Sequence, residues 1–252
     1  MANLVQGSRG REVVTLQQAL NTQLFPRPGL AEDGIFGPLT KSAVVAFQRQ
    51  AGIGVDGIVG PQTRAALGMP QPDRSFTHRI RLHFRSISDT VVPFNSILAS
   101  TQEVYAQFDI KVEFASGLSL GLSADEAAQF EQIDGTCTWN ITAGEFADLL
   151  KKGGPVPSHE ITVFFVDRFS ESINGCGGHL PDRPACIVAK RGSRFCTAHE
   201  VCHVLLGSGF SPVHITDTNN LMHPVDISRS RVPTLTTAQI SAVKASTLCV
   251  SL

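Results

Sequence analysis

The sequence predicts an α+β protein in which a small all-α N-terminal module precedes a larger domain built on a mixed, twisted sheet. Residues 1–68 carry helix-type apolar spacing and an internal repeat, whereas residues 76–252 carry several strand-type runs separated by helix-type segments. Residues 69–75 hold two prolines and no apolar period, which is typical of an extended linker. The expected limits are therefore 1–68, 69–75 and 76–252.

The composition supports folded domains and argues against two classes of partner. Hydrophobic residues make up 42% of the chain, and 21 Lys plus Arg stand against 22 Asp plus Glu, so no basic field is available to hold nucleic acid. No apolar run approaches the roughly eighteen residues of a membrane span. The opening residues, MANLVQGSRG, lack the features of a secretory signal, so no export route is visible.

The N-terminal module contains a short repeat. Asp33–Thr40, DGIFGPLT, recurs as Asp56–Thr63, DGIVGPQT. In each copy Asp-Gly favours a turn and Gly-Pro favours the start of a helix. A further amphipathic helix precedes the first copy, so the module is expected to hold three helices. Their expected apolar faces are Val13, Leu16 and Leu20, then Ala43, Val44 and Phe47, then Ala65, Ala66 and Leu67.

These segments resemble a known wall-binding family. The runs LVQGSRGREVVTLQQALN and DGIFGPLTKSAVVAFQRQAGIGVDGIVGPQTRAAL look like the three-helix peptidoglycan-binding domain found at the ends of many wall-active enzymes, over nearly all of residues 4–67. The resemblance implies bacterial peptidoglycan as a partner and an extracellular, periplasmic or wall-associated location. The alternative is a spacer or pro-segment that keeps this fold and binds nothing.

The second half reads as alternating strands and helices. Alternation predicts half-buried strands at Arg79–Phe84 and Ile110–Phe114, and a continuous apolar run predicts an interior strand at Ile161–Val166. Phe94–Phe108 fits a helix, and Ala185–Ala189 fits a further strand.

All six cysteines lie in this second half. Their even number and clustering predict disulfides in an oxidising compartment, with Cys176 and Cys186 placed to staple a loop or hairpin. The alternative is a set of reduced, buried thiols that pack as small hydrophobic groups.

The pattern His-Glu-x-x-His occurs at residues 199–203, on a segment whose apolar stripe predicts a helix ending near Gly207. Two histidines at i and i+4 stack one turn apart and can bind one ion, while Glu200 lies beside them to activate water. Chance produces this pattern about 0.01 times in a chain of such composition. The stripe consists of Ala198, Val201, Cys202 and Leu205, which makes Cys202 structural.

A catalytic zinc needs a third protein ligand. Gly207 and Gly209 allow the chain to turn after the helix, His214 is the next histidine, and Met222 follows within Asn219–Pro224. Here the chain resembles the metzincin metallopeptidases, especially the matrixin-like branch, whose third histidine precedes a methionine turn beneath the metal. The resemblance implies one catalytic Zn²⁺ held by His199, His203 and His214, with Glu200 as general base and Met222 in the turn.

The spacing departs from that family. His214 lies eleven positions after His203 instead of the usual six, so Asp217 and His223 compete as third ligand. His214 is preferred because, of the three candidates, it alone has the spacing to Met222 that the matrixin-like pattern shows between its third histidine and its methionine. His223 also replaces the family's tyrosine after the methionine and is expected to pack in the turn.

The remaining elements follow from the same resemblance. It implies a strand, a helix, three more strands, the metal helix and a C-terminal helix from about Thr236 to Ala245. Gly177–Leu180 is expected on or near the edge strand that binds an extended peptide, with His179 a surface or packed residue.

The leading functional hypothesis is a secreted, wall-tethered zinc endopeptidase, a hydrolase of polypeptide substrates. A lysin or injected toxin that cuts peptidoglycan cross-links is the second. A non-catalytic wall-binding protein with a structural metal is the third, and Glu200 argues against it because a structural site needs no general base. Residues 1–136 contain no cysteine, which excludes latency by a cysteine bound to zinc and leaves steric blocking open.

Overall fold

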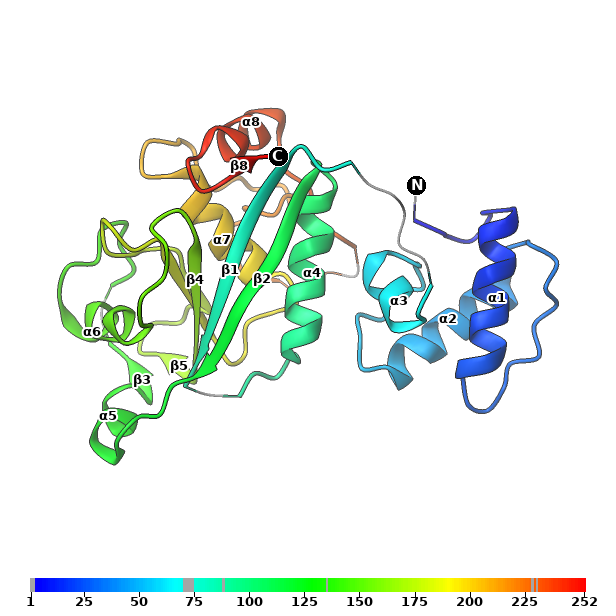
Figure 1. The fold of residues 1–252 in the computed structure, drawn as a ribbon, viewed down its shortest axis with the longest axis horizontal. Helices are drawn as coiled ribbons and strands as arrows, with labels where there is room; N and C mark the ends of the chain where they lie inside the picture. The colour runs from blue at the N-terminus through cyan, green and yellow to red at the C-terminus, as the bar shows by residue number, and fades with distance from the viewer. Residues whose placement is uncertain (1–2, 70–74, 88, 135, 228, 230) are drawn as a thin grey trace. The chain divides into compact units, whose positions relative to one another are not determined.

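A computed structural model describes residues 3–69, 75–87, 89–134, 136–227, 229 and 231–252, and divides the chain into two compact units, Met1–Ser75 and Phe76–Leu252 (Figure 1). Residues 70–74 of the expected linker 69–75 lie outside the described residues. Within the described residues no helix is both long and apolar enough to cross a bilayer.

The first unit is the expected three-helix module. Helix α1 spans Arg11–Gln23, α2 spans Pro38–Gln50 and α3 spans Pro61–Ala66, and the two later helices begin at proline, which needs no hydrogen-bond partner for its nitrogen there. The apolar faces predicted for α1 and α2 are buried. Of the face predicted for α3, Leu67 is buried as expected, but Ala65 and Ala66 are exposed, and the buried residues within the helix are Gln62, Thr63 and Arg64.

Two buried glutamines explain why the repeat folds twice in the same way. Gln17 donates to Asp33 Oδ1 (2.9 Å) and to the Ile35 carbonyl (3.1 Å), and Gln48 donates to Asp56 Oδ1 (2.8 Å) and to the Ile58 carbonyl (3.0 Å). Each glutamine also accepts from the glycine N–H of its Asp-Gly turn. Each turn is therefore locked to the preceding helix by one side chain that satisfies buried main-chain groups.

The second unit is built on a six-stranded mixed sheet in the order β2-β1-β4-β7-β6, with β8 pairing β1. Neighbouring pairs from β2 to β7 are parallel, and β6 and β8 are antiparallel to their partners. The strands are β1 (His78–Ser86), β2 (Ile110–Ser119), β4 (Ile161–Val166), β6 (Gly175–Cys176), β7 (Ala185–Ala189) and β8 (Val250–Ser251).

Both faces of the sheet are covered, as an interior strand such as β4 requires. Ile161, Val163 and Phe165 point into the core shared with α4 (Phe94–Ala106), α7 (Cys196–Leu206) and α8 (Thr237–Ala245). Phe164 and Val166 point into a second core with α6 (Gly144–Lys152). Strand β1 is apolar only toward the first core, which matches its alternating sequence.

Several elements were not expected from the sequence. Between β2 and β4 the chain adds α5 (Ala124–Gln129) and α6, and β3 (Gln132–Ile133) pairs β5 (Arg168–Phe169) in a small separate sheet. Ser123 and Glu126 form a reciprocal capping box at the start of α5.

The expected Cys176–Cys186 staple is wrong. Cys176 is joined to Cys137, with Cα atoms 5.7 Å apart, and Cys186 is a buried free thiol. Cys186 lies on β7 with its side chain in the first core, so it points away from the loop that Cys176 fastens. Cys196, Cys202 and Cys249 are likewise buried and free, so the disulfide and the packed-thiol predictions each hold for part of the set.

Candidate metal centre and cleft

Helix α7 presents its two histidines on the side away from the core. Val201, Cys202 and Leu205 are buried in the first core, and the phenolic hydroxyl of Tyr105 on α4 donates to the Ala198 carbonyl (3.0 Å), which fastens α7 to its neighbour. The helix ends at Gly207, whose φ of 75° is the left-handed conformation that favours glycine. The chain then turns back across the histidine face of the helix.

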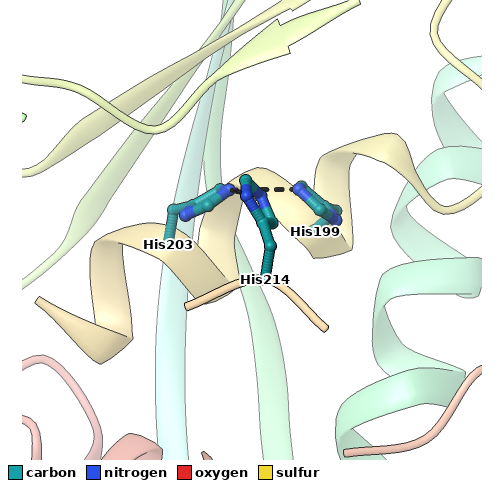
Figure 2. Close-up of side chains that lie close together, drawn as sticks. All are labelled: His199, His203 and His214. Atoms are coloured by element: carbon teal, nitrogen blue, oxygen red, sulfur yellow. Dashed lines mark hydrogen bonds between the residues drawn. The ribbon is translucent and has the colours of Figure 1, made fainter. Parts of the chain in front are cut away.

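That return brings His214 to the two helical histidines (Figure 2). The Nε2 atoms of His199 and His203 lie 3.1 Å apart, and those of His203 and His214 lie 3.0 Å apart. One nitrogen from each of the three rings lies within 4.8 Å of the other two, so the three side chains can hold one metal ion.

The surroundings keep these imidazoles neutral and oriented. His199 donates Nδ1–H to the Leu221 carbonyl (2.7 Å), which leaves its Nε2 lone pair directed at the cluster. Burial lowers the pKa of His199 to about 4 and that of His203 to about 3, because desolvation disfavours the imidazolium form. Above about pH 5 both rings are in the form that binds metals.

The turn that contains Met222 holds the histidine cluster in place through hydrogen bonds. Met222 is fully buried, its N–H donates to Asn220 Oδ1 (2.8 Å), and its carbonyl accepts from Ile215 N (3.1 Å), directly beside His214. Because Leu221 of the same turn receives the His199 hydrogen bond, one turn fixes both the helical and the loop histidine.

The two competing ligands lie outside the cluster. Asp217 is exposed and its carboxylate accepts from Asn219 N (2.9 Å), and His223 Nδ1 lies 3.3 Å from Val225 N within the turn. His223 is still close enough that its charge contributes to lowering the pKa of His214, after burial as the larger cause. Among the described residues, the group able to hold a metal consists of His199, His203 and His214.

Glu200 lies between α7 and the edge strand β6. It is buried, and a Cβ added at Gly175 would collide with its Oε1 atom. Burial raises the pKa of Glu200 well above its usual range, and the charge of Asp226 adds to that effect. A cationic metal nearby would act in the opposite direction and favour the carboxylate.

The three histidines and Glu200 line one cavity of about 470 Å³. Its walls also include residues that sequence reasoning missed. Asp226 lines the cavity and connects the segment before β6 with the segment before α7, because its Oδ2 accepts from Asn174 Nδ2 (3.0 Å) and from Ser193 N (2.9 Å). Thr138 and Trp139 also line the cavity, and neither was predicted as a site residue. No motif marks these positions, since they reach the cleft through the disulfide and through tertiary packing.

Comparison with known proteins identifies the first unit. Residues 9–67 match the family described as "Putative peptidoglycan binding domain". No curated protein matches the chain. An endolysin of Burkholderia phage AP3 is 39% identical over 28% of this chain, with a TM-score of 0.23, and the alignment spans 27% of that endolysin.

Two solved structures align with more of the chain at low identity. Metalloproteinase-II from Bacteroides fragilis is 10% identical with a TM-score of 0.47, covering 69% of this chain and 54% of that one. Archaemetzincin from Methanopyrus kandleri is 13% identical with a TM-score of 0.41, covering 69% of this chain and 97% of that one.

Proposed function

We propose that this chain is a zinc-dependent peptidase in which His199, His203 and His214 hold one Zn²⁺ and Glu200 is the general base. The observation that carries the proposal is the convergence of three imidazole nitrogens beside a buried carboxylate in one cleft. Three convergent neutral imidazoles are poor partners for one another, whereas a soft-to-borderline cation such as Zn²⁺ satisfies all three lone pairs.

The donor set fits zinc in type and spacing. Zn–N bonds of about 2.0–2.1 Å in a tetrahedral site place ligand nitrogens about 3.4 Å apart, close to the 3.0 and 3.1 Å between the Nε2 atoms here. Three protein ligands leave a fourth position for water or substrate, as catalytic zinc sites do. A bound zinc would supply Lewis acidity toward an attacking water and toward the scissile carbonyl.

The chain's own residues then move the proton and hold the substrate. Glu200 takes the proton from the attacking water and passes it to the leaving amine. Its buried position beside Gly175 keeps the carboxyl in place and limits bulk water around it. The main chain of β6 supplies groups that can pair with an extended peptide. This arrangement needs no serine or cysteine nucleophile.

The family match of the N-terminal unit supports the proposal that the peptidase acts at the bacterial cell wall. Its family match concerns peptidoglycan binding, so we propose that it tethers the catalytic unit to peptidoglycan outside the cytoplasm. The disulfide Cys137–Cys176 agrees with an oxidising location, where such bonds persist.

A second candidate substrate has support from the same match. A wall-binding module places the cleft next to peptide cross-links, so peptidoglycan itself is a candidate alongside protein substrates. Incubating the zinc-loaded protein with intact peptidoglycan and, separately, with unfolded proteins, then identifying the products by mass, tests both. New amine and carboxyl ends in either sample support a peptidase. Intact substrate in both samples would refute the proposal.

A further inference from the structure

The free edge of β6 is the main-chain surface that faces the cleft. Asn174 accepts from Ala189 N (2.8 Å) and Cys176 pairs with Ile187, so the main-chain groups of Asn174 and Cys176 point toward β7. Because hydrogen bonding alternates along an antiparallel strand, the groups of Gly175 point outward, and the same alternation, continued past the end of β6 at Cys176, places those of Gly177 and His179 outward. The first two lie directly over the site: a Cβ at Gly175 would meet Glu200, and a Cβ at Gly177 would meet His203.

The third outward position is already occupied by the chain itself. His179 N donates to the Trp139 carbonyl (3.1 Å), and the His179 carbonyl accepts from Ile141 N (3.0 Å), in a parallel bridge centred on Asn140. At Gly178 an added Cβ would collide with the Thr138 carbonyl, so the two main chains are in close contact. Residues 137–141, which we call the edge cover, thus take the place that a substrate strand would take.

The edge cover is fastened and forms a wall of the cleft. The disulfide joins Cys137, its first residue, to Cys176 on β6. The Trp139 ring packs edge-on against His179, with centroids 5.6 Å apart, and Thr138 and Trp139 line the same cavity as the three histidines. Because the cover is tied at one end and hydrogen-bonded at the other, a substrate cannot displace it without losing these contacts.

Two outward positions, Gly175 and Gly177, remain for a substrate. An extended peptide advances about 3.3 Å per residue, and Gly175 and Gly177 lie two positions apart, so a peptide whose scissile bond lies beside Glu200 at Gly175 can extend about two residues before it meets the cover. We propose that the edge cover limits the substrate to about two residues on the side of the scissile bond that faces Trp139. This inference rests on the proposed peptidase function. It favours short, branched peptides such as wall cross-links over the interior of long polypeptides.

A length series on the zinc-loaded full chain tests the inference. Peptides that share one scissile bond are extended one residue at a time on either side, and kcat/KM is measured with product identification by mass. We expect extension on one side to be tolerated, and extension past about two residues on the other side to lower kcat/KM by about tenfold or more. Equal cleavage of peptides of all lengths would refute the length limit and leave the proposed peptidase function intact. Cleavage of none of the peptides would refute the proposed peptidase function as well.

The variant Cys137→Ser tests whether the edge cover sets the limit on substrate length. Cys137 is exposed, so the substitution unties the segment without opening the core, and Cys249→Ala is the matched control because that cysteine is a free thiol outside the cleft. We expect Cys137→Ser to raise the ratio of kcat/KM for long peptides to kcat/KM for short ones, because it restores at least part of the kcat/KM that long peptides lose. An unaltered length dependence would overturn the assignment.

Hydrogen exchange gives a readout that does not depend on turnover or on any variant. In the wild-type protein the amides of His179 and Ile141 should be protected, because each donates across the bridge. Exchange of both at the rate of an unstructured peptide would show that the edge is open and would overturn the inference.

Discussion

Replacing His214 with alanine tests the loop ligand, which is the least regular part of the metal site. Its Nε2 lies 3.0 Å from that of His203, and its side chain is largely outside the core, so the change should remove a ligand with little effect on folding. Structural zinc sites with four ligands bind with about 10–16 kcal/mol, or about 2.5–4 kcal/mol per ligand. Loss of one ligand therefore predicts zinc affinity weakened by about 10²–10³-fold.

Competition with a chromophoric chelator at neutral pH measures that affinity, with Asp217→Ala and His223→Ala as matched controls. Asp217 binds the main chain of Asn219, and His223 lies in the turn, so each control should change the affinity by less than about tenfold. If either control lowered the affinity for zinc more than His214→Ala does, that residue would replace His214 as the third ligand. The interval between His214 and Met222 would then no longer support the assignment.

Three further predictions concern stability and division of labour. In the metal-free protein, Glu200→Gln should melt a few degrees above wild type at neutral pH. The reason is that burial raises the pKa of Glu200 in the folded state above its ordinary value of 4.5, so the carboxyl destabilises the fold increasingly as pH rises past that value; calorimetry should find no difference near pH 4. Deleting residues 1–68 should abolish retention on insoluble peptidoglycan in a pull-down and leave cleavage of a small soluble peptide nearly unchanged, whereas much faster cleavage would indicate a steric pro-domain. Gln48→Leu should destabilise the first unit by about 2–4 kcal/mol in chemical denaturation, since it leaves main-chain groups of the Asp-Gly turn unpaired, while Gln18→Leu on the exposed side of α1 should cost under about 1 kcal/mol.

The sequence predicted the elements whose apolar pattern is read along one segment. Strand β4 has the predicted bounds, and α7 ends at the glycine whose conformation requires it. Helices α5 and α6 were overlooked although local signals exist: the Ser123–Glu126 capping box, and the buried positions Phe146, Ala147, Leu149 and Leu150 at helical spacing. The family resemblance implies a shorter series of elements than this chain contains, since α5 and α6 are additional between β2 and β4.

Contacts that depend on the tertiary fold could not be predicted from the spacing of residues along the sequence. The pairing of Cys137 with Cys176 joins residues 39 positions apart, while the nearer Cys186 points into the opposite core. The interval between His203 and His214 is unusual, yet the loop returns His214 to the helix because the Met222 carbonyl binds Ile215 N. The metal-ligand roles of the three histidines stay a prediction, although the structure brings their side chains together.

Comparing turnover per bound zinc between wild type and Glu200→Gln distinguishes the loss of the general base from the loss of the metal. Glutamine keeps the shape of the side chain and removes the base without touching His199, His203 or His214, so both proteins should hold one zinc per chain in metal analysis. At equal zinc content, hydrolysis by the variant should fall by about 10²–10⁴-fold. Full activity in the variant, or a zinc content near zero in the wild type after zinc loading, would contradict a peptidase that works through Glu200 and this metal centre.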